Sequence, residues 1–593
     1  MKQAFALSWN DNKRGKVVAA VAAALLMAAL ASAPAASTSA ARPSGRMVGV
    51  IVRELSGSLD GPERAVERLG GEVGRHISII DGFVARVPAG GVELLEDLSG
   101  IHSVTPDARV TLLHSVDGYD ALTDLGSMHW VAGEVTGAGE YWNNGFTGQG
   151  VDVALIDSGV TPVDGLTTPG KVINGPDLSF EGQADNLRYL DSYGHGTHMA
   201  GIIAGRDNSV TTVSKGIHDQ FLGMAPGARV VSVKVAGAYG ATDVSQVLAA
   251  IDWVVQNKSA NGMNIRVLNL SFGTDGVQSY QLDPLAYAAE VAWRKGIVVV
   301  VAAGNGGYGT PKLNNRAYDP FVLAVGASDG RATYSVSDDV IPSFSSTGDG
   351  GRNPDLVAPG KSIVSLKSPG SYIDETYPAA RAGARYLKGS GTSQAAAVVS
   401  GAAALVISQR PSITPNQVKK LLTSTAQRLP VADSIAQGAG LVDLKRARDT
   451  ATPSATSSAQ AFALSTGLGS LEAARGTHHV ADDNVELVGA NDILGPFDVV
   501  TWSANSLAGR SWSNGAWNGR SWSGNCWCSV SWSGSSWSGR SWSGSSWSGR
   551  SWSGRSWSGR SWSGRSWSAG VWDSAFLGRS WSGNAWSSSL WGG

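Results

Sequence analysis

Nearly continuous apolar runs alternate with helical patterns through the middle of the chain. The runs predict five buried strands: Val151–Ile156, Val230–Val235, Val267–Ser271, Ile297–Ala302 and Val322–Ala327. Helices are predicted at Val244–Gln256 and Pro284–Lys295, and Thr414 followed by Pro415 is a good helix start. Strands that are apolar on both faces and alternate with helices predict an α/β fold, a mostly parallel sheet with helices on both faces.

A smaller segment with a different pattern comes first. Its elements are predicted as a strand at Met47–Arg53, a helix at Pro62–Leu69, strand-like residues Ile77–Val87 around a turn at Asp81-Gly82, a helix at Val92–Leu98 and an extended Ile101–Val104. The order is β-α-β-β-α-β-like. We therefore expect a small α+β domain at residues 46–113.

The first residues resemble a secretory signal. Lys13, Arg14 and Lys16 precede the apolar run Val17–Leu30, which small residues follow. The run is short for a bilayer span of about 20 residues. We assign residues 1–36 to a signal peptide, with an uncleaved anchor as the alternative, and expect the protein to be secreted into the extracellular space.

Composition narrows the class of protein. The 593 residues carry 47 Lys and Arg against 48 Asp and Glu, a net charge of -1, which argues against a general nucleic-acid binder. Both cysteines, Cys526 and Cys528, lie near the carboxyl end. The cysteine-free body therefore excludes a disulfide framework, thiolate metal sites and a cysteine nucleophile there.

Shifts in composition divide the remainder of the chain. We expect the α/β domain at residues 125–448 and a linker rich in Ser, Thr, Ala and Pro at residues 449–465. Residues 466–500 are a small segment without an assignment. Residues 501–593 form a Trp-, Ser-, Gly- and Arg-rich tail, which holds 17 of the 22 Trp.

Three short motifs in the α/β domain carry candidate chemistry. Asp157 ends the first strand and is followed by Ser158-Gly159; His195 lies in Gly194–Gly201 at the start of an apolar helix; Ser393 lies in Gly389–Ala395 at the start of another. Taken singly, each motif has a plain structural interpretation. The Asp157 motif is a turn, the His195 motif lacks the carboxylate of a metal-binding H-E-x-x-H motif, and the Ser393 motif is a helix N-cap. Strand ends in open α/β sheets are nevertheless where sites form.

Together the motifs resemble the subtilisin-like serine proteases. The order Asp157, His195, Ser393 differs from that of the other serine hydrolase groups, and Val298–Asn305 is similar to the family's strand that leads to its oxyanion Asn. The resemblance covers roughly residues 130–445. It implies a serine endopeptidase in which Ser393 is the nucleophile, His195 the base, Asp157 its orienting partner and Asn305 an oxyanion donor.

The same resemblance implies substrate-binding residues. Leu270, Ser271, Phe272 and Gly273 match one wall of the primary specificity pocket, Ala303 and Gly304 match the opposite wall, and Gly237 begins a second extended segment, Gly237–Ala241. For Leu270 and Phe272 a plain core role stays open. The family usually has Pro and His where this chain has Ala397 and Val398. That departure affects helix packing and pocket shape, not a reacting atom.

The segment Met47–Leu113 resembles the family's inhibitory propeptide, a small ferredoxin-like domain. The resemblance implies a self-processing zymogen whose own propeptide is an intramolecular inhibitor, removed between Leu113 and Trp130. A permanent partner-binding module is the alternative. Polypeptides are the expected substrates. The triad needs no cofactor and no catalytic metal is predicted, while structural calcium sites are not assignable.

The tail repeats every five residues, with Trp512, Trp517, Trp522 and every fifth residue to Trp572 in phase. It carries eight Arg and one Asp, a net of +7. Period five fits a β-solenoid with inward Trp, or a disordered chain that displays Trp and Arg to cell-wall polysaccharide or an anionic polymer. The competing function is therefore a cell-surface attachment or assembly protein, in which the tail is the main function and the protease only matures it.

Overall fold

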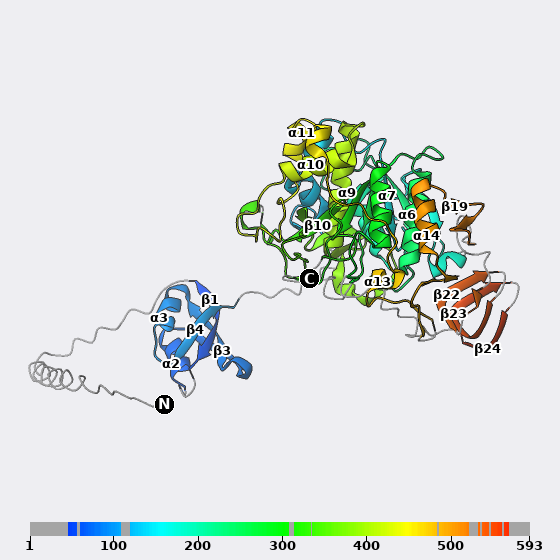
Figure 1. Ribbon diagram of the computed structural model, residues 1–593. Coiled ribbons are helices and arrows are strands. Elements are labelled where there is room, and N and C mark those ends of the chain that lie inside the picture. Colours follow the sequence, from blue (N-terminus) through cyan, green and yellow to red (C-terminus); the bar gives the residue numbers. More distant parts are fainter. Residues whose placement is uncertain are drawn as a thin grey trace, which may run out of the picture. The chain divides into compact units, whose positions relative to one another are not determined.

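A computed structural model describes residues 46–55, 58, 60–107, 119–184, 186–307, 313–333, 335–482 and 485–520, together with four backbone strands farther along the chain (Figure 1). The chain divides into two units, Met1–Leu112 and Leu113–Gly593. The predicted signal peptide at residues 1–36 lies outside the described residues.

The first unit is a four-stranded antiparallel sheet with two helices. Its elements are β1 (Met47–Glu54), α2 (Gly61–Arg68), β2 (Glu72–Ile77), β3 (Gly82–Pro88), α3 (Val92–Glu96) and β4 (Ile101–Pro106). The strands lie in the order β2-β3-β1-β4. Apolar side chains such as Val52, Val66 and Phe83 form its core. The sequence of elements is the β-α-β-β-α-β order that the pattern predicts.

One strand of this unit begins earlier than predicted. Residues Glu72–Ile77 form β2, whereas the prediction begins its strand-like stretch at Ile77. Four of the six residues are polar or glycine, and none is buried. An edge strand that faces water on both sides has no hydrophobic alternation to reveal it.

A seven-stranded parallel sheet is the centre of the second unit. The strands are β5 (Asp152–Asp157), β6 (Val172–Asp177), β7 (Arg229–Lys234), β8 (Ile265–Leu270), β9 (Val298–Ala302), β10 (Leu323–Ser328) and β11 (Leu356–Pro359). They lie in the order β11-β10-β9-β8-β5-β7-β6. The five predicted strands are all present, each within two residues of its predicted ends. The α/β prediction is confirmed.

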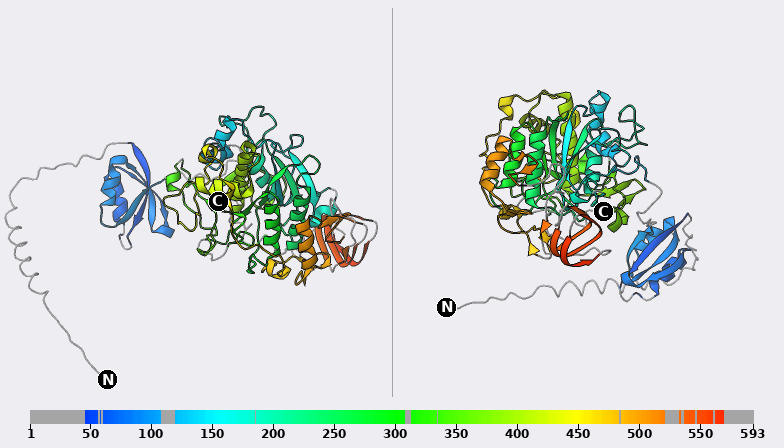
Figure 2. Two further views of the ribbon diagram at one scale, coloured as in Figure 1. Left: turned by 45° about the horizontal axis from the view of Figure 1, so that its top comes forward. Right: turned by 90° about the vertical axis from the view of Figure 1, so that its right-hand side faces the viewer.

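Helices cover both faces of this sheet (Figure 2). Helix α5 (His195–Ala204) packs against α9 (Thr392–Gln409), and α6 (Val244–Asn257) packs against α7 (Pro284–Arg294). The remaining helices of the domain are α4 (Ala138–Asn143), α8 (Tyr372–Thr376), α10 (Pro415–Thr425) and α11 (Leu444–Asp449). Among the described residues, no helix is long and apolar enough to cross a membrane.

Two strands of the large sheet were not predicted. Strand β6 contains Asn174, Gly175 and Pro176 and has a bulge between Asn174 and Asp177. Strand β11 has only four residues and ends at Pro359. Both lie at edges of the sheet, where proline and short strands are tolerated. A second small sheet contains β12 (Ile363–Leu366), β13 (Arg381–Ala382) and β14 (Tyr386–Gly389).

The chain beyond the α/β domain continues as packed structure. Its elements are α12 (Ala455–Ser458), α13 (Leu471–Arg475), β15 (Ala481–Asp482), β16 (Val485–Glu486), β17 (Asn491–Asp492), β18 (Gly495–Pro496), α14 (Val499–Ala508), β19 (Trp512–Ser513) and β20 (Ala516–Trp517). The boundary expected between residues 500 and 501 therefore falls inside α14. Composition marks where the tryptophans begin, but the helix extends across that point.

Farther along the tail, the backbone pairs in parallel. The strands are β21 (Trp532–Ser533), β22 (Ser536–Gly544), β23 (Trp547–Gly559) and β24 (Trp562–Ser568). Trp537 pairs with Trp552, and Trp552 pairs with Trp567, an offset of three five-residue repeats at each step. The pairing has the register that a solenoid of three repeats per coil requires. The solenoid itself stays a prediction.

Candidate functional site

Four predicted residues lie at the carboxyl edge of the large sheet or at the helix starts that face it. Asp157 is the last residue of β5, and Asn305 follows β9 after two residues. His195 is the first residue of α5, and Ser393 is the second residue of α9. These two helices pack against each other. The fold therefore gathers residues that are far apart in the sequence.

Asp157 and His195 form a buried pair. His195 Nδ1 lies 2.8 Å from Asp157 Oδ1 and 3.0 Å from Oδ2, and the two side chains are 2% and 1% exposed. A carboxylate accepts hydrogen bonds, so Nδ1 carries the proton in this contact. In a neutral imidazole the other nitrogen, Nε2, is then the one able to accept a proton.

A serine next to the aspartate links it to α5. Ser158 donates its backbone N–H to Asp157 Oδ1 at 2.8 Å, and its hydroxyl oxygen lies 3.2 Å from the same carboxylate oxygen. The Ser158 oxygen in turn accepts the backbone N–H of Gly196 at 2.9 Å. Strand β5 and the first turn of α5 are thereby fixed to each other, which fixes the carboxylate relative to the imidazole.

A buried carboxylate that sequence reasoning missed completes this arrangement. Asp191 accepts the backbone N–H groups of Gly194 at 2.6 Å and Thr197 at 2.7 Å, and the Ser158 hydroxyl at 2.8 Å. Burial raises the pKa of Asp191, while these hydrogen bonds act in the opposite direction. Its position four residues before His195 was the available signal. Asp191 lies three residues before Gly194, the N-cap of α5, and no motif distinguishes it there from an ordinary loop residue.

Ser393 lies in the first turn of α9 and contacts a backbone carbonyl of the neighbouring strand end. Its Oγ donates to the carbonyl oxygen of Ser271 at 2.7 Å, and it is 3% exposed. Helix α9 continues without interruption through Ala397 and Val398, which are fully buried. The departure from the family pattern therefore leaves the helix intact.

Asn305 is oriented by the residue before the serine. Its Oδ1 accepts the backbone N–H of Thr392 at 2.9 Å and the Thr392 hydroxyl at 3.0 Å. Because the amide oxygen of Asn305 accepts both hydrogen bonds from Thr392, the NH₂ group of the same amide points away from Thr392. Nδ2 lies 3.3 Å from where a Cβ on Gly391 would stand. The NH₂ group of Asn305 is thereby held beside Gly391, which lies two residues before Ser393 in the sequence.

The predicted pocket walls separate into core and surface. Leu270 is 0% and Phe272 is 3% exposed, and both belong to the main hydrophobic core. The guanidinium of Arg316 lies 4.7 Å from the Phe272 ring centroid. Ala303 is also buried. The side chains of Leu270 and Phe272 therefore have the core role that the sequence left open, so only their backbone is available to a substrate.

Gly273 and Gly304 enclose a residue that sequence reasoning did not identify. A Cβ on Gly273 would lie 2.7 Å from Asn314 Cβ, and one on Gly304 would lie 2.6 Å from Asn314 Cγ. Asn314 thus packs between the two predicted walls of the primary specificity pocket. It follows the second wall in sequence but has no motif of its own, and only the fold shows its position.

The second substrate segment differs from its prediction. Residues Gly237–Ala241 do not form an extended strand, because Gly240 N–H bonds back to the carbonyl of Gly237 at 2.9 Å. The backbone N–H of Ala238 donates to Glu181 Oε1 at 3.1 Å. Two small residues and two glycines favour this turn over an extended edge. Gly237 is at its start, half-buried.

Buried charges support this side of the site. Lys234, at the end of β7, lies 2.7 Å from Glu181, and both side chains are buried. Burial lowers the pKa of Lys234, but Glu181 and Asp177 more than offset that effect, so its pKa is raised. His198, one turn after His195, has its pKa lowered to about 3 by burial and by His195. It stays neutral near pH 7.

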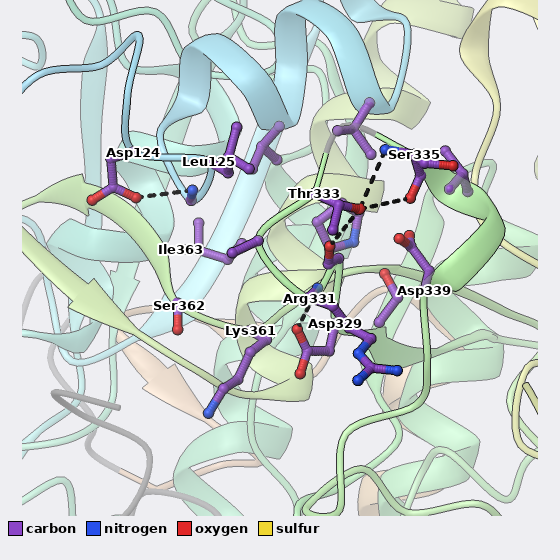
Figure 3. Close-up of a pocket in the computed structure, with 18 of the residues that line it drawn as sticks. Asp124, Leu125, Asp329, Arg331, Thr333, Ser335, Asp339, Lys361, Ser362 and Ile363 are labelled. Atoms are coloured by element: carbon purple, nitrogen blue, oxygen red, sulfur yellow. Dashed lines mark hydrogen bonds between the residues drawn. The ribbon is translucent and has the colours of Figure 1, made fainter. Parts of the chain in front are cut away.

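A separate pocket of about 340 Å³ lies away from these residues (Figure 3). Asp329, Arg331, Asp339, Lys361 and Ser362 are among the residues that line it. None of the predicted site residues does. Burial, with Asp338 and Asp329 nearby, raises the pKa of Asp339 to about 6. The pocket therefore contributes no group to the candidate active site.

Within the described part of the chain, one trio has the spacing of metal ligands. Glu54, Glu63 and His76 of the first unit have ligand atoms within 4.8 Å of one another. His76 Nε2 lies 3.1 Å from Glu63 Oε1, an ion pair when the imidazole is protonated. The trio is partly exposed and belongs to the other unit, and the chemistry of Asp157, His195 and Ser393 does not involve it.

Comparison with known proteins identifies the family of the α/β domain. A model of the subtilase family of S8 peptidases matches residues 148–454, about half of the chain, and a peptidase inhibitor domain model matches residues 29–107. Serine protease AprX of Bacillus subtilis is 36% identical over 351 residues, which cover 57% of this chain and 76% of that protein.

Two further proteins are similar to about half of the chain. Subtilisin Savinase of Lederbergia lenta is 34% identical over 309 residues, covering 51% of this chain and 93% of that protein. The crystal structure of a cold adapted subtilisin-like serine proteinase is 32% identical, covers 50% of this chain and 90% of that one, and has a TM-score of 0.39.

Proposed function

The chain belongs to the subtilase family, and from that premise we propose that Asp157, His195 and Ser393 are the catalytic triad with which it cleaves peptide bonds. It is a subtilisin-like serine endopeptidase that carries an inhibitor-like domain before the peptidase domain. The observation that carries the triad is the buried Asp157–His195 pair at 2.8 Å. A pair of this kind orients an imidazole whose second nitrogen takes the nucleophile's proton.

In the proposed reaction, His195 Nε2 removes the proton of Ser393 as Oγ attacks the substrate carbonyl carbon. A hydroxyl has one proton, which in this structure points to the Ser271 carbonyl. It must therefore turn toward His195 before transfer. The imidazolium is stabilised by Asp157 and then protonates the leaving amine, which breaks the peptide bond. Water, activated by the same histidine, releases the acyl group from Ser393.

The negative oxygen of the tetrahedral intermediate needs hydrogen-bond donors. We assign this role to Asn305 Nδ2 and the backbone N–H of Ser393. Thr392 supports this assignment: its backbone N–H donates to Asn305 Oδ1 at 2.9 Å, and this hydrogen bond orients the NH₂ group. Such a preorganised donor lowers the barrier because it needs no rearrangement when the charge develops.

We propose that the inhibitor-like first unit is a propeptide that the enzyme itself removes. Its compact core, formed by residues such as Val52 and Phe83, supports a domain that folds as a unit. The cut is expected between Leu113 and Trp130. Secretion is part of the same proposal, because Val17–Leu30 has the apolar pattern of a signal peptide. The alternative function as an attachment protein is not favoured, since the matched family covers the peptidase domain.

Ser393→Ala tests both the triad and the self-processing. The variant is expected to lose peptide hydrolysis by several orders of magnitude and to keep residues 46–113 attached, as measured by intact mass. Ser408→Ala is the matched control: Ser408 lies on the same helix, and its hydroxyl bonds only to the carbonyl of Leu405. Its processing and activity should equal those of the wild type.

Two results would contradict the proposal separately. Wild-type rates of casein cleavage by pure Ser393→Ala protein would remove Ser393 from the mechanism. Loss of hydrolysis with complete processing, in the absence of another protease, would keep the triad and exclude self-maturation.

A further inference from the structure

The segment that follows the peptidase domain contacts the two loops that flank the proposed substrate groove. We call residues 471–482 and 485–497 the bridging segment. One of these loops, Thr274–Gly276, follows the pocket wall that ends at Gly273. The other leads from Gly237–Ala241 to Asp243 at the start of α6. Two consecutive residues of the bridging segment, Ala474 and Arg475, each hold one loop.

The first contact is made through a backbone carbonyl. The oxygen of Ala474 accepts the Thr274 hydroxyl at 2.5 Å and the Asn315 side-chain amide at 3.0 Å. Beside it, Asp275 accepts the backbone N–H of Thr477 at 2.7 Å. The loop after Gly273 is therefore fixed to the bridging segment along several residues. Asn315 adjoins Asn314, which lies between the pocket walls.

The second contact is a buried ion pair. Arg475 Nε lies 2.7 Å from Asp243 Oδ2, and Nη2 lies 3.3 Å from Oδ1. The two side chains are 0% and 1% exposed. Asp243 also caps α6 by accepting the backbone N–H of Ser245 at 2.9 Å. The guanidinium donates further to the carbonyls of Gly489 and Asn491, so its position is fixed within the bridging segment.

An apolar contact reinforces the second loop. Val480, 4% exposed, packs with Phe180, and Ile493 and Leu494 lie against the pair. The next residue after Phe180, Glu181, accepts the backbone N–H of Ala238 at 3.1 Å. The bridging segment thus supports the Gly237–Ala241 turn from a second direction.

We propose that the bridging segment is part of the substrate-binding site: Ala474 and Arg475 hold the two groove walls at a fixed separation and close the groove at its far end. Thr274 follows Ser271 by three residues, which span about 10 Å of extended chain. The groove should therefore accept about three or four substrate residues on the amino side of the scissile bond. This inference rests on the proposed function, because the walls are assigned from it.

A purely structural role for these contacts makes a different prediction. If the bridging segment only stabilises the fold, its loss lowers thermal stability and affects substrates of every length alike. If it sets the groove, its loss affects long peptides more than short ones, because only long peptides reach the region beside Thr274. Arg475 is thus a positioning residue, and dependence on substrate length is the decisive readout.

The test uses the mature enzyme and alanine peptides of one to six residues that carry a chromogenic amide. The wild type should gain in kcat/KM with each residue up to about the fourth. In Arg475→Gln the ratio of kcat/KM for the longest peptide to that for the shortest should fall about tenfold, mainly through KM, and Arg475→Lys should partly restore it. Arg510→Gln changes an exposed arginine of the same extension and should leave the ratio unchanged.

Breaking a buried pair is strongly destabilising, so Arg475→Gln could fail to fold. Thr274→Val is the milder variant, because it removes one hydroxyl at the other wall, and the same ratio should fall about threefold. Equal ratios in Thr274→Val, or in a folded Arg475→Gln, and in the wild type would overturn the inference.

Peptide binding separates this inference from the proposed function. Calorimetry of the six-alanine peptide with Ser393→Ala protein, with and without Thr274→Val, measures the groove without cleavage. Weaker binding in the double variant supports the bridging role even if the wild type hydrolyses nothing, an outcome that would reject the proposed function alone. No binding to either protein would reject the groove and the inference together.

Discussion

Ser393 and Ser271 form two reciprocal hydrogen bonds, each hydroxyl with the backbone carbonyl of the other residue. Ser393 Oγ donates to the Ser271 carbonyl at 2.7 Å, and Ser271 Oγ donates to the Ser393 carbonyl at 3.3 Å. The Ser271 hydroxyl also accepts the side-chain amide of Asn269 at 2.7 Å. The start of α9 and the end of β8 are thus held together, which couples the position of the proposed nucleophile to the proposed substrate-binding wall.

Removing the Ser271 hydroxyl should loosen this coupling while leaving the carbonyl in place. In Ser271→Ala we expect kcat/KM for a peptide substrate to fall about three- to tenfold, since small displacements of a nucleophile are costly. Steady-state kinetics give the value. Ser279→Ala, at an exposed serine of the same loop region, is the control and should behave as the wild type. Equal kinetics for both variants would show that the hydroxyl has no part in positioning Ser393.

Asn305→Ala removes a proposed oxyanion donor. We expect kcat to fall about 10²–10³-fold with little change in KM, because the donor acts on charge that exists only in the transition state. The Asn305 oxygen also bonds to Thr392, so a structural contribution needs its own control. Thr392→Val removes the hydroxyl bond of 3.0 Å and should cost much less. Similar losses in both variants would assign Asn305 a structural role.

The sequence predicts the central sheet and the candidate residues Asp157, His195 and Ser393 because their signals are local. Asp157 ends an apolar strand, and His195 and Ser393 begin apolar helices after glycine turns. Each motif joins small residues to a buried strand or helix, and burial in the core requires that strand or helix to be apolar. Strand Val172–Asp177 escaped prediction because it lies at a sheet edge, where its first three residues are not fully buried and need no apolar pattern. Strand Leu356–Pro359 is apolar and mostly buried, but its four residues are too few to show a pattern.

Contacts between distant segments could not be predicted in the same way. Asp191 has no motif of its own, and only the fold shows that it accepts the backbone N–H groups of Gly194 and Thr197. Asn314 has no motif, and its place between Gly273 and Gly304 results from a fold that brings the loop after β8 against the loop after β9. Arg475 and Asp243 are separated by more than two hundred residues, and nothing in either neighbourhood indicates the other.

A buried carboxylate anchors the part of the extension that contains α14 and the first repeat tryptophans. Asp252 of α6 accepts the indole N–H groups of Trp502 and Trp517 at 2.8 Å each and the Ser506 hydroxyl at 2.5 Å. Both tryptophans are fully buried. Trp517 therefore packs on the peptidase domain, although it is in phase with the five-residue repeat. The period alone does not distinguish it from the later repeat tryptophans.

This anchor should make stability depend on pH. Burial raises the pKa of Asp252 from 3.8 to about 6, although its hydrogen bonds act the other way. The folded state thus binds the proton more tightly than the unfolded state. The Asp252 contribution to stability then increases as pH falls through 6 and is complete below about 4, reaching about 3 kcal/mol.

The measurement compares Ser393→Ala protein with the same protein carrying Asp252→Asn, which has no titrating group at this position. The difference in unfolding free energy between them, followed by tryptophan fluorescence in urea, should shift in favour of Asp252 between pH 7 and pH 4. A difference that stays constant over this range would show that Asp252 has an ordinary pKa in the folded protein.

The remaining tail offers the last prediction. Because residues 498–520 pack on the peptidase domain, a fragment that tests the free repeats should begin at residue 521 and not at 501. It contains fourteen Trp and six Arg on a Ser and Gly background, and so many aromatic rings have no use in a plain spacer. Either they are buried on one another in a solenoid, or they are displayed to a ligand. Cell-surface retention of the protease is our proposal for both cases.

Residues 521–593 should therefore sediment with washed cell walls, and a fragment with every Arg changed to Gln should do so less at low salt, because charge attraction is screened as salt increases. Ring stacking should persist at physiological salt. Blue-shifted fluorescence with a cooperative melt would indicate the solenoid, whereas emission like that of free Trp would indicate the displayed chain. A fragment that stays in the supernatant at both salt concentrations would exclude retention by the tail.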